Sequence, residues 1–271
     1  MRKRIFTRKR VLVAAGLLLV AVLGTIGTAG HLAFLRSPEH TPAEACGGTT
    51  ARPAVVGAGA SMTQGTLGGD WVGALRGRPE FGGYEFVNAG HNGDTAADLL
   101  ARLDTDVVAC HPAAVLVLVG TNDARDGTPL ERYRADLTAI TERLRSATTA
   151  RIALLSLPPL GEDLSTEINH KLSGYNTVIK ETATRAGVDY VPVHERMLGL
   201  LGPESTRQPY DFSFPLALTA ATRHYVLGQS WDEVARSGGR ALLVDHIHLN
   251  DRGAALLTDL AANWLTTITH P

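Results

Sequence analysis

Five residues in four loops have the types needed for acyl-transfer chemistry. Ser61 could act as a nucleophile, and Asp245 stands three residues before His248, a candidate general base. Two further loops carry hydrogen-bond donors, a glycine amide at Gly93 and a carboxamide at Asn122. In acyl transfer a serine attacks the carbonyl, a histidine takes the serine proton, and an aspartate orients the imidazole ring. Nearby N–H groups stabilise the developing oxyanion.

The segments between these loops must bring them together. Apolar runs typical of strands alternate with segments in which apolar residues recur at helical spacing. The expected strands are residues 53–58, 84–88, 113–119, 151–157 and 188–193, and the expected helices are 69–75, 95–108, 129–144, 164–186 and 254–266. This alternation predicts a parallel sheet with helices on both faces. The loops at the carboxyl ends of such strands meet at one edge of the sheet, where sites form.

The four loops resemble the sequence blocks of the SGNH (GDSL-type) hydrolase family, in the same order and at similar spacing. The resemblance implies an α/β fold, a three-layer α/β/α sandwich with a five-stranded parallel flavodoxin-like sheet. It also implies a metal-free site, no cofactor and ester hydrolysis. The family's nucleophile, base and acid fall on Ser61, His248 and Asp245. Its oxyanion donors fall on the Ser61 amide, the Gly93 amide and the Asn122 side chain.

The resemblance covers about residues 53–265 and departs from the family pattern at one informative position. The family usually has Asp immediately before the nucleophile, as Gly-Asp-Ser, whereas this chain has Ala60. That Asp is not a member of the triad, so the predicted chemistry does not require it. Its replacement removes a carboxylate that can hold the loops of the site.

Other polar residues in these loops have alternative interpretations. His246 could compete for the role of base, but the Asp-x-x-His spacing favours His248. We expect His91 to be exposed in the second loop, where it could line a pocket. Asp94 and Asp123 are interpreted as residues that hold the loops in place.

Two other motifs fit less well. Gly57 and Gly59 after a strand resemble the start of a dinucleotide-binding fingerprint. However, Met62 stands in place of its third glycine, and Asn88 ends the second strand without the acid that would bind a ribose. The nucleophile elbow of α/β-hydrolases requires a glycine where Thr63 stands. We therefore predict neither of these folds.

The charges are distributed unevenly. The 271 residues have a formal net charge of −1, yet six of the 26 Lys and Arg lie in the first ten residues, and no acid precedes Glu39. After residue 36 there are 19 basic and 27 acidic side chains, a net charge of −8. This acidic domain offers no electrostatic basis for binding nucleic acid.

Residues 11–35 contain no Asp, Glu, Lys or Arg. As a helix they would be about 37 Å long, enough to cross a hydrocarbon core of about 30 Å. The basic stub at residues 1–10 would stay in the cytoplasm, so the main domain would lie outside it. A cleaved signal peptide is the alternative, because residues 11–23 fit its apolar core and the small residues Gly27 and Ala29 could support cleavage. We thus predict a single-pass membrane protein or, after cleavage, a secreted one.

The remaining sequence predicts one main domain. Residues 36–52 are expected to form a linker, and residues 53–271 the hydrolase domain. Residues 203–240 break the alternation and are interpreted as an insertion with two short helices, which has its own small core or shapes a substrate pocket. Export permits a disulfide between Cys46 and Cys110, but the sequence does not show whether they approach each other.

Together these features predict an exported serine esterase that acts through a Ser-His-Asp triad and an acyl-enzyme. Candidate substrates are lipid esters such as lysophospholipids, and O-acetyl groups of envelope or environmental glycans. One alternative is an acyltransferase on envelope glycans or lipids, which would use the same site with another acceptor alcohol. A second alternative is a catalytically impaired surface binding module. It is suggested by Ala60, which replaces the usual aspartate before the nucleophile. The expected partners are an ester substrate and a membrane, and the sequence leaves the oligomeric state open.

Overall fold

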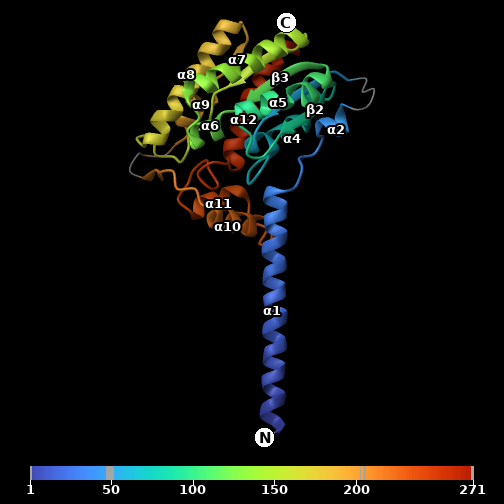
Figure 1. Ribbon diagram of the computed structural model, residues 1–271, viewed down its shortest axis with the longest axis vertical. Helices are drawn as coiled ribbons and strands as arrows, with labels where there is room; N and C mark the ends of the chain where they lie inside the picture. Colours follow the sequence, from blue (N-terminus) through green and yellow to red (C-terminus); the bar gives the residue numbers. More distant parts are fainter. Residues whose placement is uncertain (1, 47–51, 202, 204–205, 270–271) are drawn as a thin grey trace.

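A computed structural model of the chain describes residues 2–46, 52–201, 203 and 206–269, with side chains described for 12–46, 52–201, 203 and 206–268. The side chains of the predicted stub at residues 1–10, and residues 47–51 of the predicted linker, therefore lie outside the described residues. Helix α1 (Arg2–Phe34) projects from an α/β unit built around one sheet (Figure 1).

The sheet has five parallel strands in the order β2-β1-β3-β4-β5, which is the flavodoxin-like order. The strands are β1 (Ala54–Gly59), β2 (Glu85–Gly90), β3 (Pro112–Leu118), β4 (Arg151–Leu155) and β5 (Asp189–Val191). Every residue of β1 and β2 is buried, as expected of strands covered on both faces. The predicted fold class is therefore confirmed.

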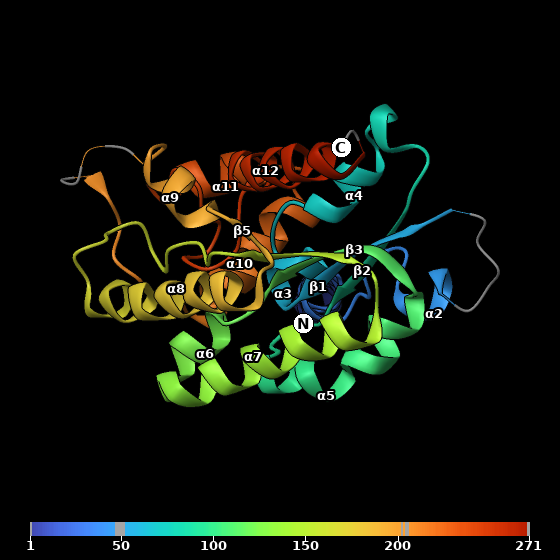
Figure 2. The same ribbon diagram turned by 90° about the horizontal axis from the view of Figure 1, so that it is seen from above.

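Helices cover both faces of this sheet (Figure 2). One layer contains α5 (Ala96–Asp106), α7 (Leu130–Ala147) and α8 (Glu167–Ala186), and the other contains α4 (Trp71–Arg76), α9 (Val193–Leu198) and α12 (Asp251–Thr269). Two 3-10 turns, η1 (Pro79–Phe81) and η2 (Val108–Cys110), lead into β2 and β3. The two layers and the sheet form the predicted three-layer sandwich.

Two strands end two residues earlier than the sequence pattern predicted. β5 stops at Val191, and helix α9 begins at Val193 where the strand was expected to continue. Pro192 between them has no N–H with which to extend the ladder. β4 stops at Leu155, because the Leu157 amide donates to the Asn176 side chain at 2.7 Å instead of to a strand.

Helices α10 (Phe214–Tyr225) and α11 (Trp231–Ser237) are the two short helices expected in the insertion at 203–240, whose residues 204–205 lie outside the described residues. They have a hydrophobic cluster of their own, separate from the main core. Trp231 and Val234 contribute to it, as do Ala29 and Ala33 of α1. The end of α1 is therefore packed against the insertion.

The described part of the predicted linker folds onto the edge of the sheet. Helix α2 (Pro42–Ala45) starts at Thr41, which forms a capping box with Glu44. The Asn88 amide of β2 donates to the His40 carbonyl at 2.9 Å. A disulfide joins Cys46 to Cys110 at the end of η2. These contacts fix the segment that enters the domain from α1.

Candidate active site

Ser61 is the first residue of α3 (Ser61–Gln64), one helical turn that begins just after β1. The Gln64 amide donates to the Ala60 carbonyl at 2.9 Å and closes this turn. Gly59 lets β3 pass close by, since a Cβ at this position would overlap the Leu118 carbonyl oxygen. The turn holds Ser61, which is 6% exposed, at the carboxyl edge of the sheet.

Asp245 and His248 lie in the loop that leads into α12. The buried carboxylate of Glu162 accepts hydrogen bonds from the backbone amides of residues 241–243 at 2.7–3.1 Å. The Arg240 side chain donates to two backbone carbonyls of the same loop at 2.8 and 3.1 Å. The loop is thus held through both its N–H and its C=O groups. Glu162 is 79 residues from the first amide it holds, and the sequence carries no local signal for this contact.

Ser61, His248 and Asp245 form one continuous chain of hydrogen bonds. His248 Nε2 lies 3.0 Å from Ser61 Oγ, and His248 Nδ1 lies 2.8 Å from Asp245 Oδ2. Asp245 Oδ1 accepts hydrogen bonds from the backbone amides of Ile247 and His248 at 3.1 and 2.9 Å. Both oxygens of this carboxylate therefore serve to position the histidine.

The electrostatics of Asp245 keep its carboxylate ionised. Burial acts to raise the pKa of this fully buried side chain, but the charge of His248 and the hydrogen bonds from His248 and Ile247 outweigh burial and hold the pKa below its ordinary value. An ionised Asp245 accepts the Nδ1 proton of His248. With Nδ1 bonded to Asp245, Nε2 is the ring atom that faces Ser61 Oγ.

The two other predicted donors, Gly93 and Asn122, come from neighbouring loops. Gly93 has a φ of +88°, and a Cβ there would meet nothing within 4 Å, so the backbone conformation alone requires glycine. Asn122, in α6 (Thr121–Asp126), is 3% exposed. Its Nδ2 donates to the carbonyl of Asp94 at 2.8 Å, which leaves its second N–H available.

The Gly93 loop is tied to the turn that carries Ser61. The His91 amide donates to the Gly59 carbonyl at 3.0 Å, and the Asn92 amide donates to Gln64 Oε1 at 2.5 Å. Hydrogen bonds therefore connect Ser61, the Gly93 loop and Asn122 at the carboxyl edge of the sheet.

Arg102 of α5 is a site component that the sequence did not indicate. Its guanidinium donates to Asp94 Oδ2 at 2.7 Å and to the Gly59 and Ala89 carbonyls at 3.0 Å each. A fourth hydrogen bond reaches Asp106 at 2.9 Å. Only the i,i+4 spacing to Asp106 is visible in the sequence, whereas the other contacts depend on the tertiary fold.

Asp123 holds a neighbouring segment, as the sequence predicted for it and for Asp94. Its Oδ2 accepts a hydrogen bond of 2.9 Å from the Ala96 amide at the start of α5. Burial is the main cause that raises the pKa of Asp123 above its ordinary value.

The competing histidine, His246, points elsewhere. Its Nε2 lies 3.5 Å from the Arg240 guanidinium, while His248 is the histidine beside Ser61. Burial, followed by the charge of Arg240, lowers the pKa of the His246 ring. This geometry agrees with the choice of His248 from the Asp-x-x-His spacing.

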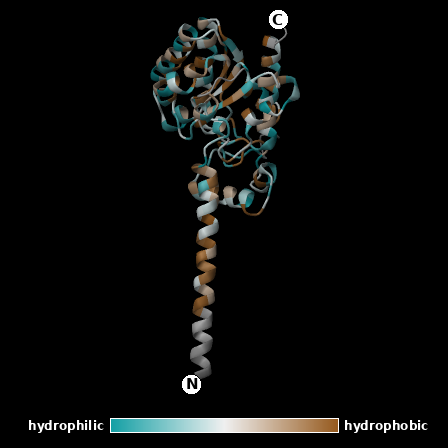
Figure 3. Cartoon of the chain, turned by 90° about the vertical axis from the view of Figure 1, so that its right-hand side faces the viewer, coloured by the Kyte–Doolittle hydropathy of each residue, from teal (hydrophilic) through white to brown (hydrophobic). Residues whose placement is uncertain are grey.

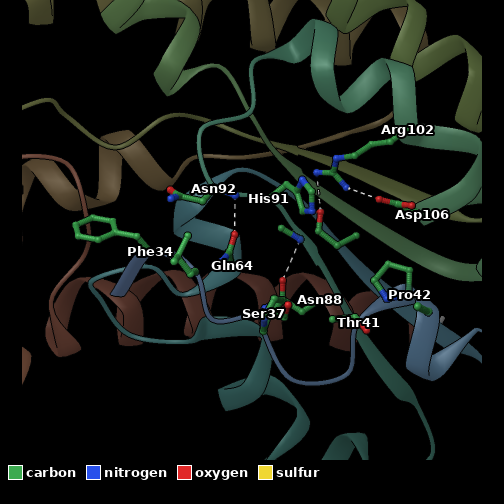
Figure 4. Close-up of a pocket in the computed structure, with 15 residues that line it drawn as sticks. Phe34, Ser37, Thr41, Pro42, Gln64, Asn88, His91, Asn92, Arg102 and Asp106 are labelled. Carbon is green, nitrogen blue, oxygen red and sulfur yellow. Dashed lines mark hydrogen bonds and ion pairs between the residues drawn. The ribbon is translucent and has the colours of Figure 1, made fainter. Parts of the chain in front are cut away.

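A pocket of about 490 Å³ adjoins this edge (Figure 4). Its walls come from the end of α1, the linker, the carboxyl end of β2 and the Gly93 loop, and include Phe34, Leu35, Gln64, His91 and Asn92. Ser61 does not line it, so the pocket flanks the triad. His91 is exposed and lines the pocket, as expected from the sequence.

The described residues contain no candidate metal-binding site. No group of three or more His, Cys, Asp and Glu residues in that part could share an ion. The His248 imidazole is hydrogen-bonded to the Asp245 carboxylate and to the Ser61 hydroxyl instead.

Two curated proteins match part of the chain. Esterase TesA of Pseudomonas aeruginosa is 36% identical over 93 residues, which are 33% of this chain and 46% of TesA. YqeF, an uncharacterized lipoprotein of Bacillus subtilis, is 32% identical over 94 residues, which are 32% of this chain and 38% of YqeF. The chain thus matches less than half the length of either relative.

Solved structures show the same fold. The acetyl xylan esterase AlAXEase superposes with a TM-score of 0.58 at 19% identity, covering 78% of this chain and 98% of that enzyme. The sequence pattern of the GDSL-like lipase/acylhydrolase family matches residues 55–256. The family match agrees with the resemblance to GDSL-type hydrolases seen in the sequence. The chain belongs to the GDSL-like lipase/acylhydrolase family.

Proposed function

We propose that the protein is a serine esterase that hydrolyses carboxylic esters through an acyl-enzyme on Ser61. The observation that carries this proposal is the hydrogen-bonded chain of Ser61, His248 and Asp245, with distances of 3.0 and 2.8 Å. A serine, a neutral imidazole and an ionised carboxylate in this order are the parts that nucleophilic acyl transfer needs. Membership of the lipase/acylhydrolase family supports the same chemistry.

In the proposed acylation, Ser61 Oγ attacks the ester carbonyl carbon while His248 Nε2 takes the hydroxyl proton. The carbonyl π electrons move to oxygen and give a tetrahedral oxyanion. As this intermediate collapses, the bond to the alcohol breaks, and His248 gives its proton to the leaving alcohol. In deacylation His248 takes a proton from water, which attacks the acyl-enzyme. Collapse then releases the carboxylic acid and returns the proton to Ser61.

The oxyanion would be held by the Ser61 and Gly93 amides and by Asn122 Nδ2. The links between the Gly93 loop, Gln64 and Gly59 support this assignment, because they join the donors to the turn of the nucleophile. Donors that are fixed before the reaction stabilise the transition state without reorganising. Ala60 carries no carboxylate to hold these loops, whereas the Arg102 guanidinium bonds to both the Asp94 carboxylate and the Gly59 carbonyl.

We place the catalytic domain outside the cytoplasm, anchored by α1. The described part of the chain has one helix long and apolar enough to cross a membrane, at Leu12–Phe34 (Figure 3), and a cleaved signal sequence would pass the same test. The Cys46–Cys110 disulfide supports an oxidising compartment. The lipoprotein relative also favours an envelope location.

The proposed substrates are esters of envelope-associated alcohols, either lipid esters or O-acetylated glycans. The names of TesA, an esterase, and AlAXEase, an acetyl xylan esterase, are the support for this class. The pocket beside the Gly93 loop has both apolar and polar walls, Phe34 and Leu35 against Gln64 and Asn92, and would receive one part of such a substrate.

The test is hydrolysis of p-nitrophenyl acetate by the purified full chain in detergent. We expect turnover by the wild type and by Ser146→Ala, which changes an exposed serine of α7. Ser61→Ala and His248→Ala should each lose nearly all activity while unfolding at the wild-type temperature. A folded wild type that neither hydrolyses this ester nor reacts with a fluorophosphonate would instead be a binding module.

A further inference from the structure

Four exposed apolar side chains gather where α1 enters the domain. Outside α1, five large apolar side chains of the described residues are exposed, namely Leu35, Leu130, Phe214, Val226 and Leu227. Leu35 directly follows α1, and Phe214, Val226 and Leu227 belong to the insertion. Leu35, Phe214 and Leu227 are 73%, 64% and 65% exposed. A group of exposed apolar side chains on one part of a protein surface is typical of an interaction site.

We propose that this surface, formed by Leu35, α10 and the turn at Val226 and Leu227, lies in the interface between water and the non-cytoplasmic face of the membrane that α1 spans. The occupant is the headgroup and upper acyl-chain region of a lipid bilayer. The inference rests on the proposed anchoring by α1 and goes beyond it, because it gives the catalytic domain a second point of membrane contact.

The depth of α1 in a membrane places α10 at this interface. The apolar segment Leu12–Phe34 has 23 residues, or about 34 Å of helix, against a hydrocarbon core of about 30 Å. Helix α10 packs on the last turns of that segment, where Ala29 and Ala33 are buried. The Leu218 Cδ1 atom would lie 3.8 Å from a Cβ on Gly30. A helix in contact with residues 29–33 of the span cannot be far from the lipid headgroups.

Both ends of α10 are fixed to the chain that leaves the membrane. At its start the Phe214 ring stacks on Phe34, with ring centroids 5.0 Å apart. At its end the Arg36 guanidinium lies 6.0 Å from the centroid of the Tyr225 ring. The end of α10 is therefore tied to Arg36, the residue that follows Leu35. Figure 1 shows α10 as the part of the domain beside the top of α1.

The composition of this segment suits a lipid surface. Residues 212–231 contain no Asp or Glu, although the chain after residue 36 has a net charge of −8. Tyr225 and Arg36 have the amphipathic character of residues at membrane interfaces, with an apolar body and a polar end. An apolar face without acidic residues meets little repulsion from phosphate headgroups.

The contact would also orient the active site. Val244 belongs to the same hydrophobic cluster as α10 and directly precedes Asp245. Leu67 of that cluster lies six residues after Ser61. With α1 as its only attachment the domain could tilt relative to the membrane plane, whereas contact through α10 would hold one edge of the domain toward the lipid.

The test uses the full chain with one added cysteine, since both native cysteines are in the disulfide. Phe214→Cys and Leu227→Cys are labelled with an environment-sensitive fluorophore and reconstituted in phosphatidylcholine–phosphatidylglycerol vesicles. Ser146→Cys, in α7 on the far side of the domain from α1, is the aqueous control (Figure 1). Leu19→Cys reports on the anchor itself. Quenching is measured with lipids that carry a nitroxide near the headgroup or deep in the acyl chain.

We expect blue-shifted emission at Phe214→Cys and Leu227→Cys, with severalfold stronger quenching by the shallow nitroxide than at Ser146→Cys. Leu19→Cys should respond most to the deep nitroxide. If Leu19→Cys is quenched but the two surface labels behave like Ser146→Cys, the anchor stands and the second contact is wrong. Blue-shifted surface labels that no lipid quenches would mean that a second copy of the chain covers this face, which also overturns the proposal. An unquenched Leu19→Cys would refute the anchor and this inference together.

Discussion

Arg102 Nε lies 2.7 Å from Asp94 Oδ2, and this ion pair joins helix α5 to the loop of Gly93. The same guanidinium holds the Gly59 carbonyl, two residues before Ser61. One side chain thus sets the spacing between the predicted nucleophile and a predicted oxyanion donor. The Arg102 side chain is only 15% exposed, so solvent screens this pair less than a surface ion pair.

Loss of Arg102 should misplace the Gly93 loop. We expect Arg102→Ala to lower kcat for ester hydrolysis roughly 10- to 100-fold, with a smaller change in KM, because small displacements of positioned groups are costly in the transition state. Arg102→Lys should recover little, since an ammonium cannot reproduce the planar fork of donors. Arg134→Ala is the matched control, as Arg134 pairs with Glu181 on the surface of α7 and α8. Equal kcat values for the wild type and Arg102→Ala would disprove this positioning role.

Asn122 should act mainly on the transition state. Removal of one oxyanion donor costs about 10²–10³ in kcat, so we predict a loss of this size for Asn122→Ala, with KM nearly unchanged. Steady-state kinetics with a soluble ester will measure it, with circular dichroism as the check on folding. A variant that lost affinity but kept kcat would show that Asn122 binds the substrate instead.

The disulfide should contribute to stability. It closes a loop of 64 residues, for which the chain-entropy model gives about 4 kcal/mol, and measured values are typically about 2–4 kcal/mol. We expect Cys46→Ser/Cys110→Ser to unfold at a lower temperature by differential scanning fluorimetry, and reduction of the wild type to have the same effect. If neither treatment moves the transition, the disulfide does not contribute to the stability of the fold.

Stability should fall on mild acidification, in part because of His246. Burial and the charge of Arg240 lower the pKa of this ring, while Asp245, Asp211 and Glu162 act in the opposite direction. The unfolded chain, with an ordinary histidine pKa of about 6.5, then binds the proton more readily, so stability decreases as the pH falls below that value.

The check is the unfolding temperature between pH 7.5 and 5.5, compared with His246→Asn. The position has a φ of +74°, which asparagine tolerates better than most residues. The variant should lose less stability than the wild type over this interval. Parallel curves for the two proteins would rule out a contribution from His246.

Much of the fold could be predicted from local patterns. Apolar runs such as residues 113–119 marked the strands, and the loops after them carried Ser61, Gly93 and Asn122. The Asp-x-x-His spacing favoured His248, and in the structure a three-residue turn brings Asp245 onto the ring and backbone amide of this histidine.

The rest depends on contacts between distant segments. The pairing of Cys46 with Cys110 needs α2 folded against the sheet edge, which no local pattern shows. The roles of Arg102 and Glu162 arise from backbone carbonyls and amides that carry no side-chain signature. The packing of α10 on α1 likewise joins segments almost two hundred residues apart, and short apolar patterns do not identify their partner.

The central claim is that Ser61 is the nucleophile. The most direct test is to treat the full chain with a fluorophosphonate and locate the adduct by peptide mass spectrometry. We predict a single adduct on Ser61, absent from Ser61→Ala, strongly reduced in His248→Ala and unchanged in Ser146→Ala. Equal labelling of the wild type and Ser61→Ala, or an adduct on another residue, would contradict the account.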